Sequence, residues 1–130
     1  MSRKLTAEER AAMKAATKDA EGEKAVQQAL AKMAPADRAL GKKVHALVRK
    51  AAPGLMPRTW YGMPAYANAD GKVVVFFRDA GKFKERYAMI GFQDTARLDS
   101  GAMWPVAYAL TKLGPADEAK LTKLVKQAVK

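Results

Sequence analysis

Aromatic and basic residues gather in one part of the sequence, with a composition typical of a binding groove. The segment TWYGMPAY, residues 59–66, surrounds one glycine with aromatic side chains, and AGKFKERY, residues 80–87, interleaves basic and aromatic residues. Aromatic rings pack against flat ligand groups, and lysine and arginine side chains attract anions. The candidate ligand-binding residues are Trp60, Tyr61, Met63, Tyr66, Lys82, Lys84, Arg86 and Trp104.

Side chains alternate along an extended segment, and this alternation predicts how the candidate residues divide. Tyr61 and Met63 would face one way. Trp60 and Tyr66 would face the other way, and both sets are buried only if the segment is covered on two sides. We therefore expect one set to border a groove for a small anionic ligand, with Trp104 as the second wall and the basic segment as a positive rim. The alternative is that both tryptophans fill the core and the methionines fill gaps in it.

Residue types that carry out covalent or acid–base catalysis are scarce. The chain has no cysteine, which excludes thiol nucleophiles, disulfides and thiolate metal ligands. Its serines, Ser2 and Ser100, do not lie in the strand-to-helix turn from which a serine nucleophile acts. Its single histidine, His45, has no carboxylate three or four residues away, so we expect it to be a satisfied or exposed helix residue. We expect a binding protein without a cofactor rather than an enzyme.

Carboxylates bind a hard metal such as iron when several of them converge. Asp19, Glu21 and Glu23 form the densest acidic stretch, and Asp94 with Asp99 is a second pair. A glycine interrupts the first group, so we expect these side chains to be solvated and iron to bind weakly or not at all. Iron binding or delivery is one alternative function.

The net charge is +11, from 24 Lys and Arg residues against 13 Asp and Glu, and both halves of the chain share it. A field of this sign attracts polyanions without selecting a sequence. Residues 80–87 also have a composition that binds phosphates and stacks bases, although Glu85 interrupts it and the glycine spacing of an RNA-recognition strand is missing. Non-specific nucleic-acid binding is the second alternative, and a solvated, charged surface is the simpler interpretation.

The chain is predicted to form a single domain, residues 1–130, that begins with peripheral helices over residues 1–34. Thr6 and Glu9 have the spacing of a capping box, which starts a helix. Gly22 is expected to interrupt this helix, and apolar residues then recur at helical spacing as far as Pro35.

Residues 35–130 are predicted to form the core of the domain. The clearest apolar stripe lies in a helix over residues 36–52, and a second helix covers residues 116–130. Between them, strands are expected in PAY, residues 64–66, and in residues 72–77, 86–92 and 105–110, the last at a sheet edge. The predicted fold class is α+β, with an antiparallel sheet of three to five strands between residues 64 and 110 packed against helices.

Several segments in a fixed order resemble the YdhG-like family, domain of unknown function 1801. They are TWYGMPAY, GKVVVFF, KFKERYAMIGF, LDSGAMWPVAYAL and LVKQAV. The resemblance runs from DRALGKKVHALV to the end of the chain and implies a small α/β domain with an antiparallel sheet flanked by helices. It also implies an iron-related role, because some members are regarded as frataxin-like iron chaperones that use an acidic helical surface. Here the helices are rich in lysine instead.

Targeting signals are not apparent in the sequence. No apolar run reaches the roughly 18 residues that a spanning helix needs, and the first residues lack the apolar stretch of a signal peptide. The absence of cysteine is compatible with a reducing compartment. We therefore expect a cytoplasmic protein with no membrane partner.

Overall fold

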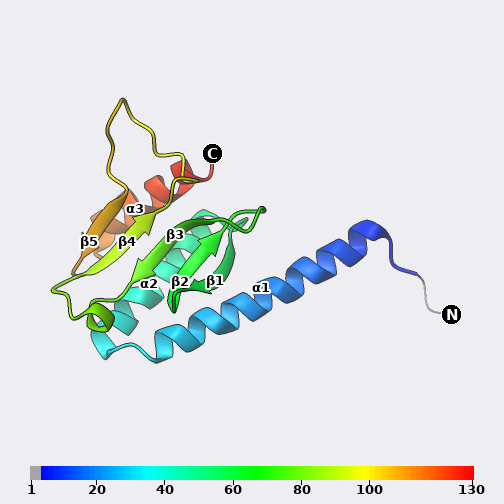
Figure 1. Ribbon diagram of the computed structural model, residues 1–130, viewed down its shortest axis with the longest axis horizontal. Coiled ribbons are helices and arrows are strands. Elements are labelled where there is room, and N and C mark those ends of the chain that lie inside the picture. The colour runs from blue at the N-terminus through cyan, green and yellow to red at the C-terminus, as the bar shows by residue number, and fades with distance from the viewer. Residues whose placement is uncertain (1–3) are drawn as a thin grey trace.

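A computed structural model describes residues 4–130 as a five-stranded antiparallel sheet with three α-helices (Figure 1). The strands are β1 (Met56–Trp60), β2 (Met63–Ala67), β3 (Val73–Arg78), β4 (Ala88–Phe92) and β5 (Ala107–Leu110). The helices are α1 (Ala7–Ala31), α2 (Pro35–Ala51) and α3 (Pro115–Ala128), with a short 3-10 helix, η1 (Gly81–Phe83), between β3 and β4. The predicted α+β class with an antiparallel sheet is confirmed, while Ser2 lies outside the described residues.

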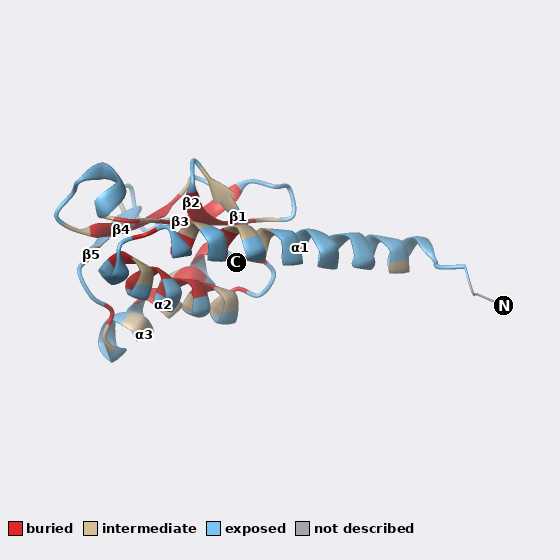
Figure 2. Cartoon of the chain, turned by 90° about the horizontal axis from the view of Figure 1, so that it is seen from below, coloured by how far each residue is buried: buried red, intermediate tan, exposed pale blue. Residues whose placement is uncertain are grey.

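The sheet is a meander in which each strand pairs with its neighbour in sequence, in the order β1-β2-β3-β4-β5. All of these pairs are antiparallel. Helices α2 and α3 lie on one side of the sheet, and within residues 4–130 the other side carries only connecting segments (Figure 2). The sheet therefore has a helix-covered face and an open face.

The helix-covered face holds the main hydrophobic core. Val75, Phe77 and Ile90 are fully buried there. They pack in one cluster with Val44 and Val48, which come from the apolar stripe of α2. Full burial of such side chains contributes roughly 1.5–3 kcal/mol each, so this layer dominates the stability of the fold.

The open face carries a second, smaller apolar cluster that no helix covers. Its buried members are Met63, Ala65, Val73 and Phe76, with Trp60 and Met89 partly buried against them. The ring of Phe76 lies across Gly91, where an added Cβ atom would be 2.3 Å from the ring. The cluster is therefore a single layer of side chains, in which the larger side chains keep water away from the smaller ones.

Helix α1 is continuous through Gly22, so the predicted interruption is wrong. A Cβ atom at Gly22 would lie 1.9 Å from the carbonyl oxygen of Pro57. Glycine costs some helix stability at this position, but it lets the backbone of α1 lie directly against β1. Beyond this contact, Val26 and Leu30 are buried in the main core.

The N-terminal half of α1 projects from the rest of the molecule (Figures 1 and 2). Thr6 and Glu9 form the predicted capping box at its start. Residues 10–18 are all exposed, and Met13 is 57% exposed. The predicted peripheral position holds for this half of the helix, whereas its C-terminal half belongs to the core.

The sheet also begins earlier than predicted, because residues 56–60 form β1. Pro57 lies inside this strand and donates no backbone hydrogen bond. Strand β1 is at the edge of the sheet, where a missing donor is tolerated. The first strand therefore gives a weak signal in the sequence.

Candidate ligand-binding site

The aromatic segment is a β-hairpin and not one extended strand. Trp60 pairs with Met63, so Tyr61 and Gly62 form a two-residue turn between β1 and β2. Both turn residues have positive φ, 51° and 75° respectively. Hairpin turns of type I′ require this conformation because its twist matches that of the strands. It holds the Tyr61 side chain out at the tip, 78% exposed.

The turn places the candidate aromatic residues on two different faces. Trp60 and Met63, as cross-strand partners, belong to the open face. Tyr66 is fully buried in the main core on the helix-covered face. The prediction that Trp60 and Tyr66 face the same way is wrong, because it assumed that the chain continued straight through Tyr61 and Gly62.

Trp104 does not form a second wall beside the hairpin. It is half-buried and packs against the main core. Trp60, in contrast, belongs to the cluster on the open face, where its ring meets those of Tyr61 and Phe76 edge to face. The two tryptophans therefore pack against different clusters, Trp104 against the main core and Trp60 against the cluster on the open face.

Lys82 reaches the hairpin, as the predicted basic rim requires. Its Nζ donates a 2.6 Å hydrogen bond to the carbonyl oxygen of Tyr61. Lys84 ends η1 in the left-handed conformation and is exposed. Arg86 is exposed as well and lies with its guanidinium 5.1 Å from the ring centroid of Tyr87. Of the three predicted cations, only Lys82 has a described contact with the hairpin.

A cavity of about 750 Å³ opens where the C-terminal end of α1, the β1–β2 turn and the β3–β4 connection meet. The charged residues of its lining are Lys32, Lys82 and Asp79. The other lining residues are Ala25, Gln28, Ala29, Met33, Ala34, Thr59, Gly62 and Gly81. The cavity therefore combines apolar side chains with two lysines, and of the candidate ligand-binding residues its lining contains Lys82 alone.

Two buried carboxylates fix the loop that carries Lys82. Asp37, in the first turn of α2, accepts hydrogen bonds from the backbone N–H groups of Ala80 and Gly81, at 3.3 and 3.0 Å. Asp79 accepts the N–H of Lys82 at 3.0 Å. Because these bonds hold the loop backbone, Lys82 starts from a fixed position at the mouth of the cavity. The sequence prediction missed the role of Asp37.

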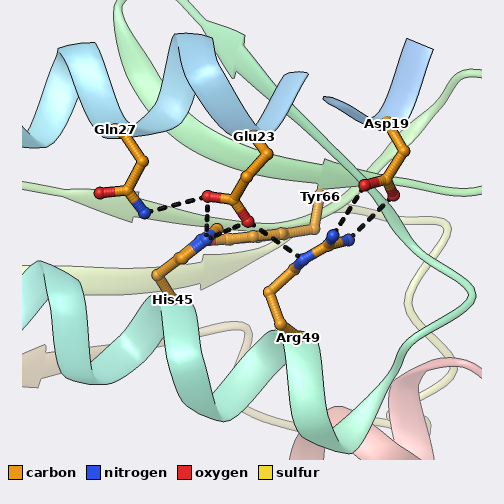
Figure 3. A network of polar contacts seen from close by, with 6 residues as sticks. All are labelled: Asp19, Glu23, Gln27, His45, Arg49 and Tyr66. Carbon is orange, nitrogen blue, oxygen red and sulfur yellow. Dashed lines mark hydrogen bonds and ion pairs between the residues drawn. The ribbon is translucent and has the colours of Figure 1, made fainter. Parts of the chain in front are cut away.

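A polar cluster, separate from the cavity, links α1, α2 and β2 (Figure 3). Its members are Asp19, Glu23, Gln27, His45, Arg49 and Tyr66. The two ring nitrogens of His45 contact different partners: Nδ1 lies 2.7 Å from Tyr66 Oη, and Nε2 lies 2.8 Å from the carboxylate oxygens of Glu23. A carboxylate only accepts hydrogen bonds, so these partners assign a proton to Nε2. In the neutral ring, Tyr66 Oη then donates to Nδ1.

Arg49 extends this cluster along the helices (Figure 3). Its guanidinium donates two hydrogen bonds to Asp19, at 2.7 and 3.0 Å, and its Nε lies 3.4 Å from Glu23. Gln27 donates a further hydrogen bond to Glu23 at 2.9 Å. The sequence prediction missed Gln27 and Arg49 and the contact between the two helices. The spacing was a visible signal, since Asp19, Glu23 and Gln27 are four residues apart, as are His45 and Arg49.

The electrostatics of this cluster suit a structural role. Burial raises the pKa of Tyr66 well above its usual value, and the charge of Glu23 raises it further. Burial would raise the pKa of Glu23 too, but the hydrogen bonds from Gln27 and His45 and the positive charges nearby outweigh burial and lower that pKa. The Tyr66 hydroxyl therefore stays protonated as a donor, and the completely buried side chain offers no surface to a substrate. The prediction of a satisfied His45 is confirmed.

The acidic side chains proposed for iron do not gather into a ligand set. Asp19 and Glu23 are occupied by Arg49 and His45, while Glu21 is exposed. Across residues 4–130, no group of three or more histidine, cysteine, aspartate or glutamate side chains is arranged to hold a metal ion. The expectation that the acidic residues are solvated was wrong for Asp19 and Glu23, because both point at α2.

Within the described residues 4–130, no helix combines the length and the apolar character needed to cross a bilayer. No protein-family profile, curated protein or solved structure matches this chain.

Proposed function

We propose that this protein is a non-enzymatic binding module that holds a small anionic ligand in the cavity between α1 and the β1–β2 turn. The observation that carries the proposal is the presence of two lysines, Lys32 and Lys82, in the lining of a cavity of about 750 Å³. A volume of this size falls within the range of small-molecule sites. The cations are the feature that selects the charge of the ligand.

The lysine ammonium groups can donate hydrogen bonds to a ligand. An ammonium group has three N–H donors, and the contact of Lys82 with the Tyr61 carbonyl uses one of them. Asp79 opposes an anion electrostatically, but one of its oxygens already accepts the N–H of Lys82. A ligand that places its acidic group at Lys32 and Lys82, and an apolar part against Ala29 and Met33, satisfies the lining of the cavity.

We propose that the cavity binds its ligand without catalysing a reaction. The cavity lining contains no histidine, serine, tyrosine or cysteine. The histidine of the chain, His45, is held between Glu23 and Tyr66 in the polar cluster. We place this binding activity in the cytoplasm, because a chain without cysteine suits a reducing compartment.

A ligand screen tests this function directly. Small carboxylates and phosphate esters would be screened by thermal shift, and hits would be measured by calorimetry. We expect a bound ligand to raise the melting temperature of the wild-type protein and the Lys32→Gln/Lys82→Gln variant to lose that rise.

The matched control removes two exposed lysines from the helices instead, Lys42→Gln/Lys123→Gln. It lowers the net charge equally and leaves the cavity intact. If the control loses as much binding as the cavity variant, the ligand responds to net charge alone and the cavity is not the site.

A further inference from the structure

The open face of the sheet carries an accessible aromatic surface that adjoins the cavity at Lys82. Trp60 contacts Phe76 with ring centroids 5.3 Å apart and Tyr61 with centroids 5.0 Å apart, both edge to face. The Tyr61 ring stands largely in solvent, and Phe83 in η1 is 46% exposed. Rings that fill a core are not left exposed in this way, so part of this aromatic group is available for contact.

Cations surround these rings. The guanidinium of Arg78 lies 4.7 Å from the centroid of the Phe83 ring, and Lys82 Nζ lies 5.7 Å from it. On the other side of Trp60, Arg58 and Lys72 line a shallow hollow of about 300 Å³. The aromatic rings are therefore flanked by positive charge on two sides.

Negative charge is sparse on this face. Glu85 is paired with Arg78. Asp94 lines the hollow beside Arg58 and Lys72, where two cations outweigh it. Lys84 and Arg86 add two more exposed cations in the β3–β4 connection. The surface is thus complementary to a ligand that repeats negative charge along its length.

We propose that the open face binds single-stranded nucleic acid. Unpaired bases would stack on the exposed rings of Tyr61 and Phe83 and on the free side of Trp60, and phosphates would lie against Arg58 and Lys72. This combination of stacking rings with a positive groove is how proteins hold single strands with little sequence preference. A duplex keeps its bases stacked inside and an acidic peptide has no flat bases, so neither would use the rings.

The test measures binding of a fluorescein-labelled oligothymidylate of 15 nucleotides by fluorescence anisotropy at low salt. We expect Tyr61→Ala to weaken binding by roughly fivefold or more, the smallest effect that one stacked base gives. Tyr61→Phe keeps the ring and should bind like the wild type. Tyr61 is exposed at a turn, so both variants should fold, and circular dichroism checks this.

The salt dependence locates the phosphates. Arg58→Gln/Lys72→Gln should reduce the slope of log affinity against log salt by up to about 1.4, since each single-strand phosphate contact contributes about 0.7. The control Lys42→Gln/Lys123→Gln changes the net charge equally but lies on the helices, and it should leave the slope nearly unchanged.

Intrinsic fluorescence gives an independent readout. In a Trp104→Phe background, Trp60 is the remaining tryptophan, and its emission should be quenched as the oligonucleotide binds. The proposal is overturned if Tyr61→Ala binds as well as the wild type, if the emission of Trp60 does not change, or if the control pair reduces the slope as much as Arg58→Gln/Lys72→Gln. Equal or tighter binding of a duplex of the same length, or of an acidic polyglutamate peptide, overturns it as well.

Discussion

The two faces of the sheet use the same strands but protect their apolar residues differently. Phe76 and Phe77 are consecutive in β3, and both are largely or fully buried. Phe77 lies under the helices in the main core, whereas the ring of Phe76 lies on the open face against Gly91. Apolar side chains on the helix-covered face are thus buried by the helices. Those on the open face are buried by neighbouring side chains of the sheet itself.

This comparison predicts unequal losses when each ring is removed. We expect Phe77→Ala to lower the free energy of unfolding by about 3–5 kcal/mol, because a cavity remains under the helices. Phe76→Ala should cost about 1.5–3 kcal/mol, since water reaches the vacated place and only the transfer term is lost. Urea unfolding followed by circular dichroism measures both. An equal or larger loss for Phe76→Ala would show that something covers the open face.

Much of this architecture can be predicted from the sequence, because alternation in strands and the apolar stripe of α2 both reflect burial. VVVFF predicts a strand in which Phe76 and Phe77 face opposite sides of the sheet, but it does not say which side the helices cover. A close approach between the backbones of a helix and a strand also leaves no recognisable pattern in the sequence. Gly22 reads as a helix breaker in the sequence, and only the position of Pro57 explains why glycine is tolerated there.

The helix-covered face depends on that approach of α1 to β1. Gly22→Ala places a methyl group 1.9 Å from the Pro57 carbonyl oxygen. We expect a loss of about 1–3 kcal/mol in unfolding free energy from overpacking, although alanine itself favours the helix. Gly54→Ala is the matched control, because a Cβ atom there meets nothing within 4 Å. A Gly22→Ala variant as stable as the control would contradict the contact.

A smaller loss of stability is expected when Glu23 is replaced in the polar cluster that links α1, α2 and β2. The pKa of Glu23 is lowered in the folded protein, so its contribution to stability is present above the unfolded pKa, near 4.5, and is lost as the pH falls through the folded value. Glu23→Gln should cost about 1 kcal/mol or less at neutral pH, because the side chain is about one third exposed. Urea unfolding at several pH values should show the two proteins converging in acid.

Other charged and polar groups near Glu23 also affect how the stability of Glu23→Gln changes with pH. His45, Arg49 and Gln27 face the Glu23 carboxylate, and Asp19 shares Arg49 with it. Glu21→Gln, on the exposed side of α1, serves as the matched control with the same charge change. A stability difference for Glu23→Gln that stays constant down to pH 3 would mean that the carboxylate charge is not what matters.

Iron should have the smallest effect of all. Asp19 and Glu23 on α1 are already paired with Arg49 and His45 on α2, and the net charge of +11 repels cations. We expect calorimetric titration with ferrous and ferric iron to show affinity of about micromolar or weaker. Tight, saturable binding that is lost in an Asp19→Asn/Glu21→Gln/Glu23→Gln variant would contradict this prediction and support the iron-related alternative.

The candidate sites were less predictable than the fold for a geometric reason. A two-residue turn at Tyr61 and Gly62 reverses the faces of everything after it, and tyrosine is an uncommon residue at positive φ. Of the predicted basic rim, Lys82 is the residue with a described contact to the hairpin. The sequence prediction could not separate Trp60 from Tyr66 or place Trp104, because long-range packing decides both.

The uneven attachment of α1 has a consequence for backbone hydrogen exchange. Opening the amides of residues 10–18 breaks only hydrogen bonds of the helix itself, since those residues touch little else. Amides near Val26 and Leu30 can open only when the main core separates. Protection factors along one uninterrupted helix should therefore rise by orders of magnitude from its N-terminus to its C-terminus, so that a single element reports both fraying and global unfolding.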